Sequence, residues 1–121
     1  MLILKNKAFD EWAKEEKIDD SVLIDAIEEL QQGLYEANLG GLVYKKRIPA
    51  KGKGKRAGAR TIVAYRDNRL AVFMYGYLKS EKIDLSKREK QAFKMLAEKY
   101  VQHNEDNLKS AIDSGKLVRV M

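Results

Sequence analysis

Cysteine is absent from the sequence, and proline and histidine occur once each. Because the chain lacks cysteine, it can form neither a disulfide framework nor a thiolate zinc site. The single histidine, His103, lies in a polar stretch with no second histidine near it. We therefore interpret His103 as an ordinary surface residue and not as part of a catalytic triad or a metal site. We expect neither a metal ion nor a cofactor.

Long apolar runs are missing as well. No stretch approaches the roughly 20 apolar residues that cross a bilayer, and residues 1–6 lack the basic start and apolar run of a signal peptide. The 121 residues fit one domain with a modest core, since 45% of them are hydrophobic and 35% are charged. We expect a soluble cytoplasmic protein with no membrane partner.

Positive charge is concentrated in one segment. Between Tyr44 and Arg60 the sequence holds eight basic residues and no acidic residue. The rest of the chain holds 16 basic and 18 acidic residues, a net charge of −2, although the whole chain carries +6. Charges that serve only solubility are scattered, whereas a local block predicts a polyanionic partner. We expect this partner to be RNA.

Helical spacing of apolar residues occurs at both ends of the chain. It predicts one helix over 7–17 and a second helix from Asp19 or Asp20 to about Gln32. Further along, Ser86-Lys87-Arg88-Glu89 is a capping box that opens a third helix. The two adjacent N-terminal helices suggest a helical hairpin laid on a sheet.

Alternation with a period of two predicts strands in the middle of the chain. These strands cover 42–48, 59–66 and 69–78, and Asp67-Asn68 forms a hairpin turn between the last two. Residues 2–4 are apolar and form a further short strand tucked against the sheet.

The order of elements predicts an α+β fold. We expect an N-terminal helical hairpin packed on a small antiparallel sheet, a meander, with a C-terminal helix. The tail is expected to add a short helix over 105–114 and a short strand over 117–120.

Alternation along the predicted strand 42–48 assigns its side chains to the two faces of the sheet. Lys45 and Arg47 share one face of their strand, while Tyr44, Lys46 and Ile48 share the other. If the three strands pair as a meander, Lys45, Arg47, Arg60 and the end of the third strand converge on one surface. Bidentate arginine contacts there would hold a phosphodiester, and a tyrosine would stack on an exposed base. The alternative is a solvated sheet face beside an irregular loop.

The sequence argues against a nucleotide-binding loop and against paired catalytic carboxylates. The glycine- and lysine-rich loop 51–58 lacks the spacing of a phosphate-binding nucleotide loop, and no helix follows it. The paired acidic residues Asp19-Asp20 and Glu28-Glu29 are better explained as helix caps or solvated helix faces than as catalytic carboxylates. Arginine, lysine and tyrosine remain as the candidate chemistry.

Several residue runs occur together in a characteristic order. They are Leu39-Gly40-Gly41-Leu42, Lys45, Arg47, the basic loop 51–56, Gly58-Ala59-Arg60-Thr61-Ile62 and Tyr75-Gly76. In this combination the chain resembles the RelE/ParE toxin superfamily, and most closely the HigB-like RelE branch of type II toxin–antitoxin modules. The resemblance covers residues 2–101. It implies a toxin domain over 1–103, with 104–121 as a C-terminal extension packed on the same domain.

The resemblance also implies a function. Members of this family are usually endoribonucleases that cut mRNA in the ribosomal A site, and a partner antitoxin, often a helix-turn-helix protein, neutralises them. The implied reaction needs no metal: the ribose 2′-OH attacks phosphorus and leaves a 2′,3′-cyclic phosphate and a 5′-OH. Two alternatives stay open, a non-catalytic RNA- or ribosome-binding protein and a gyrase-directed ParE-like toxin.

The resemblance also implies roles for individual residues, taken from the positions that match the family pattern. Arg60 is expected to bind the scissile phosphate, with Lys45 and Arg47 on the preceding strand and Lys79 as a further cation after the third strand. Tyr77, or a lysine, is expected to handle a proton. The remaining cations are expected to bind mRNA or ribosomal RNA; they are Lys46, Lys51, Lys53, Lys55, Arg56 and Lys82.

Overall fold

A computed structural model describes residues 1–50 and 58–121. The expected RNA-binding residues Lys51, Lys53, Lys55 and Arg56 therefore lie outside the described residues. In chain order the elements are β1 (Leu2–Asn6), α1 (Lys7–Glu15), α2 (Asp20–Gln31), β2 (Ala37–Gly40), β3 (Val43–Ile48), β4 (Ala59–Arg66), β5 (Leu70–Leu78), α3 (Lys87–Gln102), α4 (Glu105–Asp113) and β6 (Leu117–Arg119). The α+β prediction is confirmed.

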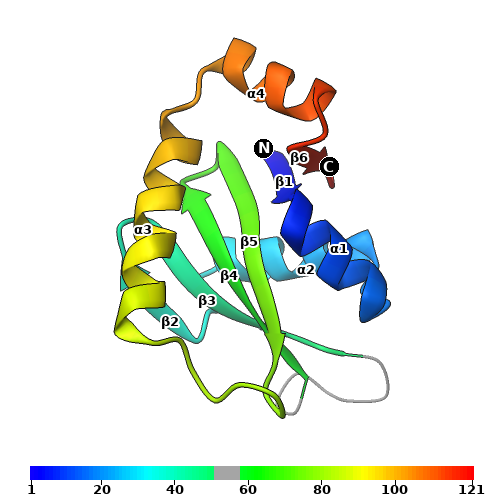
Figure 1. Ribbon diagram of the computed structural model, residues 1–121, viewed down its shortest axis with the longest axis vertical. Coiled ribbons are helices and arrows are strands. Elements are labelled where there is room, and N and C mark those ends of the chain that lie inside the picture. The colour runs from blue at the N-terminus through cyan, green and yellow to red at the C-terminus, as the bar shows by residue number, and fades with distance from the viewer. Residues whose placement is uncertain (51–57) are drawn as a thin grey trace.

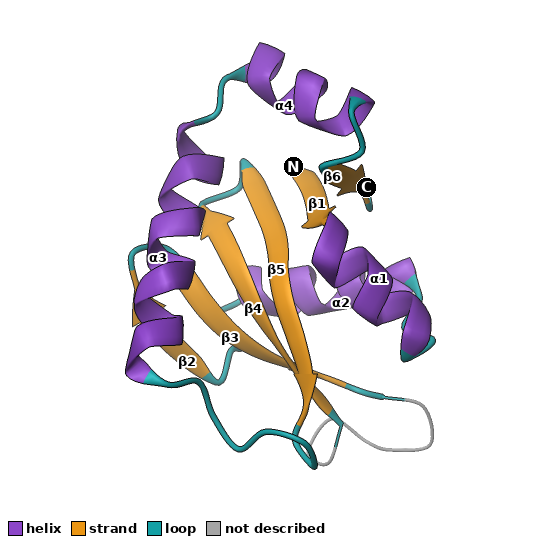
Figure 2. Cartoon of the chain, in the orientation of Figure 1, coloured by secondary structure: helices purple, strands orange, loops and turns teal. Residues whose placement is uncertain are grey.

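One mostly antiparallel sheet lies between two helical layers, with strands in the order β2-β3-β4-β5-β1-β6 (Figure 1). Among the strand pairs of the described residues, β1–β5 alone is parallel. Helices α1 and α2 cover one face of the sheet and α3 covers the other (Figure 2). Helix α4 leads from α3 to β6, so both chain ends lie at the same side of the sheet.

The core is divided by the sheet into two apolar clusters. On the α1/α2 side the largest buried side chains include Phe9, Leu23 and Phe73. On the α3 side they include Leu4, Ile62 and Met74. Strand β4 is buried on both faces over its whole length except Arg66, so it lies at the centre of the core.

The sheet has one strand, β2, beyond the three-stranded meander and the short strands at 2–4 and 117–120 that the sequence indicates. Strand β2 was not predicted, because it is only four residues long and its residues Ala-Asn-Leu-Gly have low β propensity. Its pairing with β3 supplies the order that its own sequence does not. Strand β1 lies between β5 and β6, and the capping box at Ser86 is formed as predicted.

An irregularity in β5 decides which side chains reach the α3 face. Along the β4–β5 pair, Ile62 lies opposite Tyr75 but Val63 lies opposite Phe73, so Met74 is an extra residue in β5. Such a bulge reverses the alternation beyond it. Tyr77 consequently lies on the α3 face, where regular alternation from Phe73 would have pointed it toward α1.

No helix in the described part of the chain combines the length and apolar character needed to cross a bilayer.

Candidate functional site

Three strands bring a row of polar side chains together on the α3 face. In the strand register, Arg47 of β3 lies opposite Arg60 of β4, and Arg60 lies opposite Tyr77 of β5. Directly opposed residues on neighbouring antiparallel strands have Cβ atoms about 4.5–5.5 Å apart. The convergence of Arg47, Arg60 and the end of the third strand thus follows from backbone pairing.

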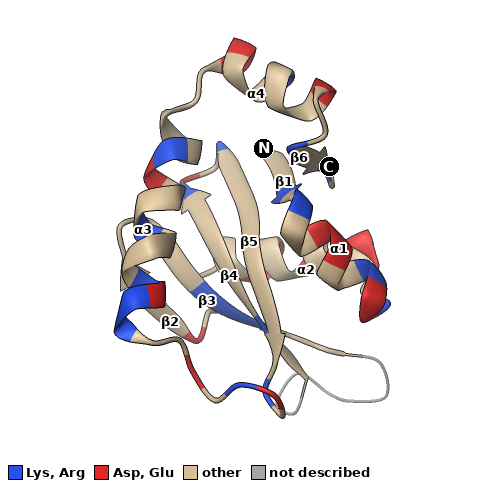
Figure 3. Cartoon of the chain, in the orientation of Figure 1, with Lys and Arg blue, Asp and Glu red and all other residues tan. Residues whose placement is uncertain are grey.

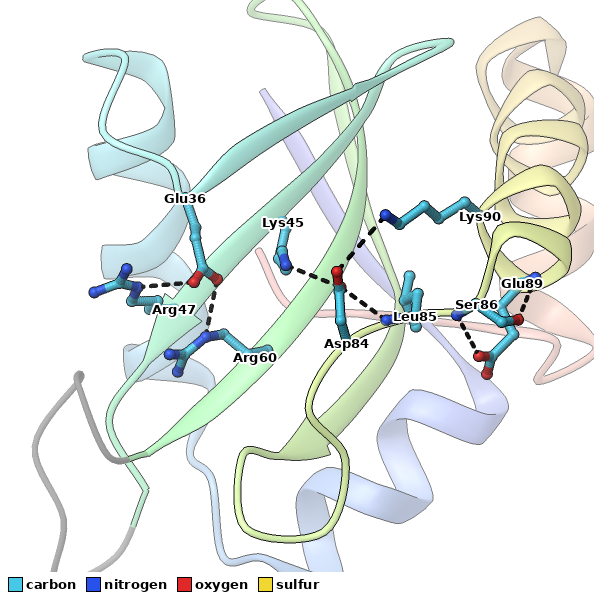
Figure 4. Close-up of polar contacts among 9 residues, drawn as sticks. All are labelled: Glu36, Lys45, Arg47, Arg60, Asp84, Leu85, Ser86, Glu89 and Lys90. Atoms are coloured by element: carbon cyan, nitrogen blue, oxygen red, sulfur yellow. Dashed lines mark hydrogen bonds and ion pairs between the residues drawn. The ribbon is translucent and has the colours of Figure 1, made fainter.

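A carboxylate joins the two arginines of this row (Figure 4). The Glu36 carboxylate lies 2.9 Å from Nε of Arg60 and 3.3 Å from Nε of Arg47. The Arg60 side chain is 5% exposed, while that of Arg47 is 42% exposed. An anion arriving from solvent therefore meets Arg47 before it meets Arg60.

Glu36 was not identified from the sequence. It immediately precedes β2, the strand that the sequence pattern did not predict. Its N–H donates to the carbonyl of Lys45 at 2.9 Å, which extends the β2–β3 pairing to this residue. The available signal was an acidic residue four positions before Gly40, near the start of the basic strand, but a short strand of low β propensity concealed it.

A second carboxylate holds the lysines beside the row. The Asp84 carboxylate lies 3.0 Å from Nζ of Lys45 and 3.7 Å from Nζ of Lys90, and it accepts from the N–H of Leu85 at 2.8 Å (Figure 4). The hydrogen bond from Lys45, followed by that from Leu85, lowers the pKa of Asp84 below its ordinary value of 3.8. Asp84 thereby fastens the segment between β5 and α3 to strand β3.

Tyr77 is buried, with 4% of its surface exposed. Burial, together with the negative charges of Asp84 and Glu36, raises the pKa of Tyr77 to about 12, although Arg60 acts in the opposite direction. Within the described residues, the Tyr77 hydroxyl has no hydrogen-bond partner. At neutral pH this hydroxyl holds its proton and can donate it.

Lys79 and Lys82 follow β5, on the segment that runs toward α3. Lys79 is exposed, and its N–H donates to the carbonyl of Gly58 at 3.4 Å. Nζ of Lys82 lies 2.8 Å from the carboxylate of Glu89, and this hydrogen bond raises the pKa of Lys82. Figure 3 shows basic positions of β3 and of this segment toward the same end of the sheet.

Lys46 lies apart from the other expected site residues. It occupies the opposite face of β3, where its side chain is 7% exposed and its Nζ lies 2.9 Å from the carboxylate of Glu29 on α2. This is the face that alternation assigns to it, and the contact fixes α2 to the sheet. The structure therefore places Lys46 outside the surface that contains Lys45 and Arg47.

The surface is suited to bind a phosphodiester. In the described part of the chain, the ion pairs of Lys45, Arg47, Arg60 and Lys90 on this surface share two carboxylates, Glu36 and Asp84, so the group carries more positive than negative charge. Guanidinium groups bind phosphate oxygens through parallel N–H donors. In residues 1–50 and 58–121, no group of three or more histidine, cysteine or acidic side chains is arranged to hold a metal ion.

Comparison with known families identifies the chain by a match over nearly its whole length. The family model described as the RelE toxin of the RelE/RelB toxin–antitoxin system matches residues 1–120, which is nearly the whole chain and includes α4 and β6. No curated protein has a sequence that matches this chain.

Proposed function

The chain belongs to the RelE toxin family, and we propose that it is the toxin of a type II toxin–antitoxin module, of the HigB-like branch, that cuts mRNA on the ribosome. The observation that carries this proposal is the set of side chains Arg47, Arg60 and Tyr77, which lie side by side across β3, β4 and β5 and which we call the arginine row. Two guanidiniums beside a protonated hydroxyl supply both the charge and the proton that cleavage of a phosphodiester requires.

In the proposed reaction the ribose 2′-oxygen attacks the adjacent phosphorus and the bond from phosphorus to the 5′-oxygen breaks. Arg47, Arg60 and Lys45 stabilise the negative charge that develops on the phosphorane oxygens. The products are a 2′,3′-cyclic phosphate and a 5′-OH. No step uses a metal ion or a cofactor.

Two groups are proposed to move the protons. Glu36, the carboxylate in contact with both guanidiniums, accepts the proton of the 2′-OH. Tyr77 donates its proton to the departing 5′-oxygen. Its pKa of about 12 keeps the hydroxyl protonated at neutral pH, so the proton is present when the 5′-oxygen departs. After one turnover Glu36 has gained a proton and Tyr77 has lost one, so the proton count balances.

The remaining cations are proposed to bind the RNA backbone. Lys79 and Lys82 border the row on the segment after β5, and the loop residues Lys51, Lys53, Lys55 and Arg56 add a block of charge next to β3 and β4 in the sequence. Lys46 is left out of this proposal because it pairs with Glu29 on the other face.

We further propose that a cognate antitoxin with a helix-turn-helix domain neutralises the protein in the cytoplasm by covering the arginine row. Residues 104–121 are proposed to be an extension of the toxin domain 1–103. The pairing of β6 with β1 supports this, since it completes the shared sheet.

One observation favours a second candidate, a non-catalytic RNA- or ribosome-binding protein. Glu36 already binds Nε of Arg60, whose side chain is almost fully buried. A phosphate therefore reaches Arg60 only if this group opens or if Arg60 acts through Glu36. A protein that merely binds RNA would need only the exposed Arg47 and the neighbouring lysines.

The test is mRNA cleavage in a reconstituted translation mixture, with protein freed of metal by EDTA and then of EDTA before mixing. Discrete cuts within codons that carry 5′-OH and cyclic-phosphate ends support the proposal. Intact mRNA with protein retained on ribosomes selects the binding protein. Intact mRNA together with trapped gyrase–DNA complexes in a parallel assay selects the gyrase-directed toxin.

A further inference from the structure

The parallel pair β1–β5 leaves half of one edge of β5 open. Strand β1 pairs with β5 only from Leu70 to Phe73. The Asn6 side chain donates to the carbonyl of Met74 at 3.0 Å and closes the pairing there. Beyond this point a cavity of about 430 Å³ lies along the edge of β5. It falls within the range of about 300–1,000 Å³ that is usual for small-ligand sites.

Aromatic rings line much of this cavity, which we call the edge pocket. Its lining residues are Ala8, Phe9, Trp12, Tyr75, Gly76, Tyr77, Glu81 and Lys82. Phe9 packs behind Trp12, with ring centroids 5.3 Å apart. The two charged lining residues, Glu81 and Lys82, belong to the segment that follows β5. An aromatic wall with a few polar groups is typical of sites that bind flat, polar-edged ligands.

The position of Trp12 depends on Gly76. A Cβ atom at residue 76 would lie 2.2 Å from Cζ3 of the Trp12 ring, so only glycine allows the indole to lie against the β5 backbone. Trp12 is nevertheless only partly buried. The glycine thus fixes one face of the ring against the sheet and leaves part of the side chain accessible.

The edge pocket adjoins the arginine row through one shared residue. Tyr77 lines the pocket and also lies opposite Arg60 in the strand register. The row lies on the α3 face and Trp12 on the α1 face, but β1 does not pair with β5 beyond Phe73. A nucleotide whose phosphate contacts the arginine row can therefore place its base around this edge of β5, against Trp12. In single-stranded RNA the base lies one ribose away from its phosphate, which matches this adjacency.

We propose that the edge pocket binds one unpaired nucleobase of the RNA substrate, next to the scissile phosphate, by stacking on Trp12. This proposal rests on the proposed function, since it takes the arginine row as the phosphate site. The carboxylate of Glu81 and the ammonium of Lys82 stand where the polar edge of the base lies, so they bias which base is accepted. Stacking on one aromatic side chain contributes about 5–150-fold to affinity.

Trp12 is the only tryptophan in the chain, so its fluorescence reports on the pocket directly. The probe is a short single-stranded RNA with 2′-O-methyl riboses, which the proposed reaction cannot cleave. Titration with this RNA is expected to quench Trp12 fluorescence in a saturable manner. The same RNA with one abasic position is expected to bind about 5–150-fold more weakly and to leave the fluorescence nearly unchanged.

Variants separate the pocket from the basic surface. Gly76→Ala displaces the indole and is expected to abolish quenching, while Lys82→Gln, a milder change at the pocket mouth, is expected to alter the order of affinities among RNAs that differ in one base. A matched control, Lys109→Gln on α4, is expected to behave as the wild type, since Lys109 is exposed and does not line the pocket.

The two proposals fail in different ways. Unchanged fluorescence at RNA concentrations that saturate binding by fluorescence polarisation, or no binding at millimolar RNA, would overturn the edge pocket. Quenching by the intact RNA and the abasic RNA alike would also overturn it. If the RNA quenches Trp12 in a saturable, base-dependent manner but the protein never cuts mRNA, base binding in the edge pocket is supported and the proposed nuclease activity is contradicted.

Discussion

Arg47 and Arg60 face each other across β3 and β4, and their Nε atoms lie 3.3 and 2.9 Å from the same carboxylate, that of Glu36. The two residues differ in exposure, since Arg60 is buried beneath the surface on which Arg47 is accessible. One carboxylate thus holds an outer and an inner guanidinium in fixed positions. This arrangement explains why the basic segment folds into a defined site although its like charges repel one another.

Neighbouring lysines on β3 provide the first prediction. Lys45→Gln removes a cation on the face of the arginine row, whereas Lys46→Gln removes one on the opposite face. We expect Lys45→Gln to lower mRNA cleavage by about 10²–10³-fold, as for loss of one stabilising group. Lys46→Gln is expected to leave cleavage of the folded protein unchanged but to lower the free energy of unfolding by about 1.5–3 kcal/mol, because the buried Lys46 loses its ion pair with Glu29.

Cleavage rates and urea unfolding curves of both variants check this prediction. If both variants are folded under the assay conditions and lose cleavage equally, the face of β3 on which a lysine lies has no effect on cleavage. In that case the lysines act only as diffuse charge.

Glu36 provides the second prediction. Glu36→Gln keeps the size of the side chain but removes its charge and its capacity to take a proton. We expect cleavage to fall by about 10²–10⁴-fold, while Glu29→Gln, which changes a carboxylate paired with Lys46 on the other face, leaves the rate intact. The measurement is single-turnover cleavage at saturating ribosome complex. Full activity of Glu36→Gln would remove Glu36 from the reaction and leave it a purely structural partner of the arginines.

Tyr77 provides the third prediction. Tyr77→Phe is expected to lower cleavage by about 10²–10⁴-fold, and the rate should return when the leaving 5′-oxygen of the RNA is replaced by sulfur. A thiolate departs without a proton, so it bypasses the acid but not the base. Glu36→Gln should gain no such rescue. A Tyr77→Phe variant that cuts both substrates at the wild-type rate would exclude Tyr77 as the proton donor.

The raised pKa of Tyr77 has a measurable consequence for stability. The ordinary value is 10.0 and the value in the folded protein is about 12, so the folded state binds the proton more tightly than the unfolded state. The contribution of Tyr77 to stability is therefore fully present below pH 10.0 and is lost as pH rises toward about 12. A difference titration of tyrosinate absorbance, wild type minus Tyr77→Phe, should have its midpoint near the higher value. A midpoint near 10.0 would contradict the buried environment.

Much of the fold was predictable because its elements carry regular patterns. Helices α1, α2 and α3 have apolar stripes, and β4 and β5 are rich in β-forming residues. Strand β2 was not predictable, since four residues with an asparagine and a glycine depend on β3 for their conformation. The place of β1 between β5 and β6 was not predictable either, because alternation does not encode which strand pairs with which.

The site was predictable in part for related reasons. Alternation placed Lys45, Arg47 and Arg60 on common faces, and the register brings Arg47 and Arg60 together. Tyr77 joins them only because Met74 is an extra residue in β5, and nothing in the alternation marks that bulge. Glu36 depends on the unpredicted strand β2, so the carboxylate at the centre of the site could not be found from the sequence pattern.

The most direct test of the account compares two arginines of β4 in the reconstituted translation assay. Arg60 and Arg66 lie on the same strand, but Arg66 is at its far end, where its Nη1 donates to the carbonyl of Val101. With circular dichroism confirming that each variant is folded, Arg66→Ala should cut mRNA as the wild type does. Arg60→Ala should lose at least about 10²-fold in rate, and Arg60→Lys serves in its place if the alanine variant unfolds. A folded Arg60 variant with full activity, leaving 5′-OH ends at the same positions, would contradict the assignment of the arginine row as the site of cleavage.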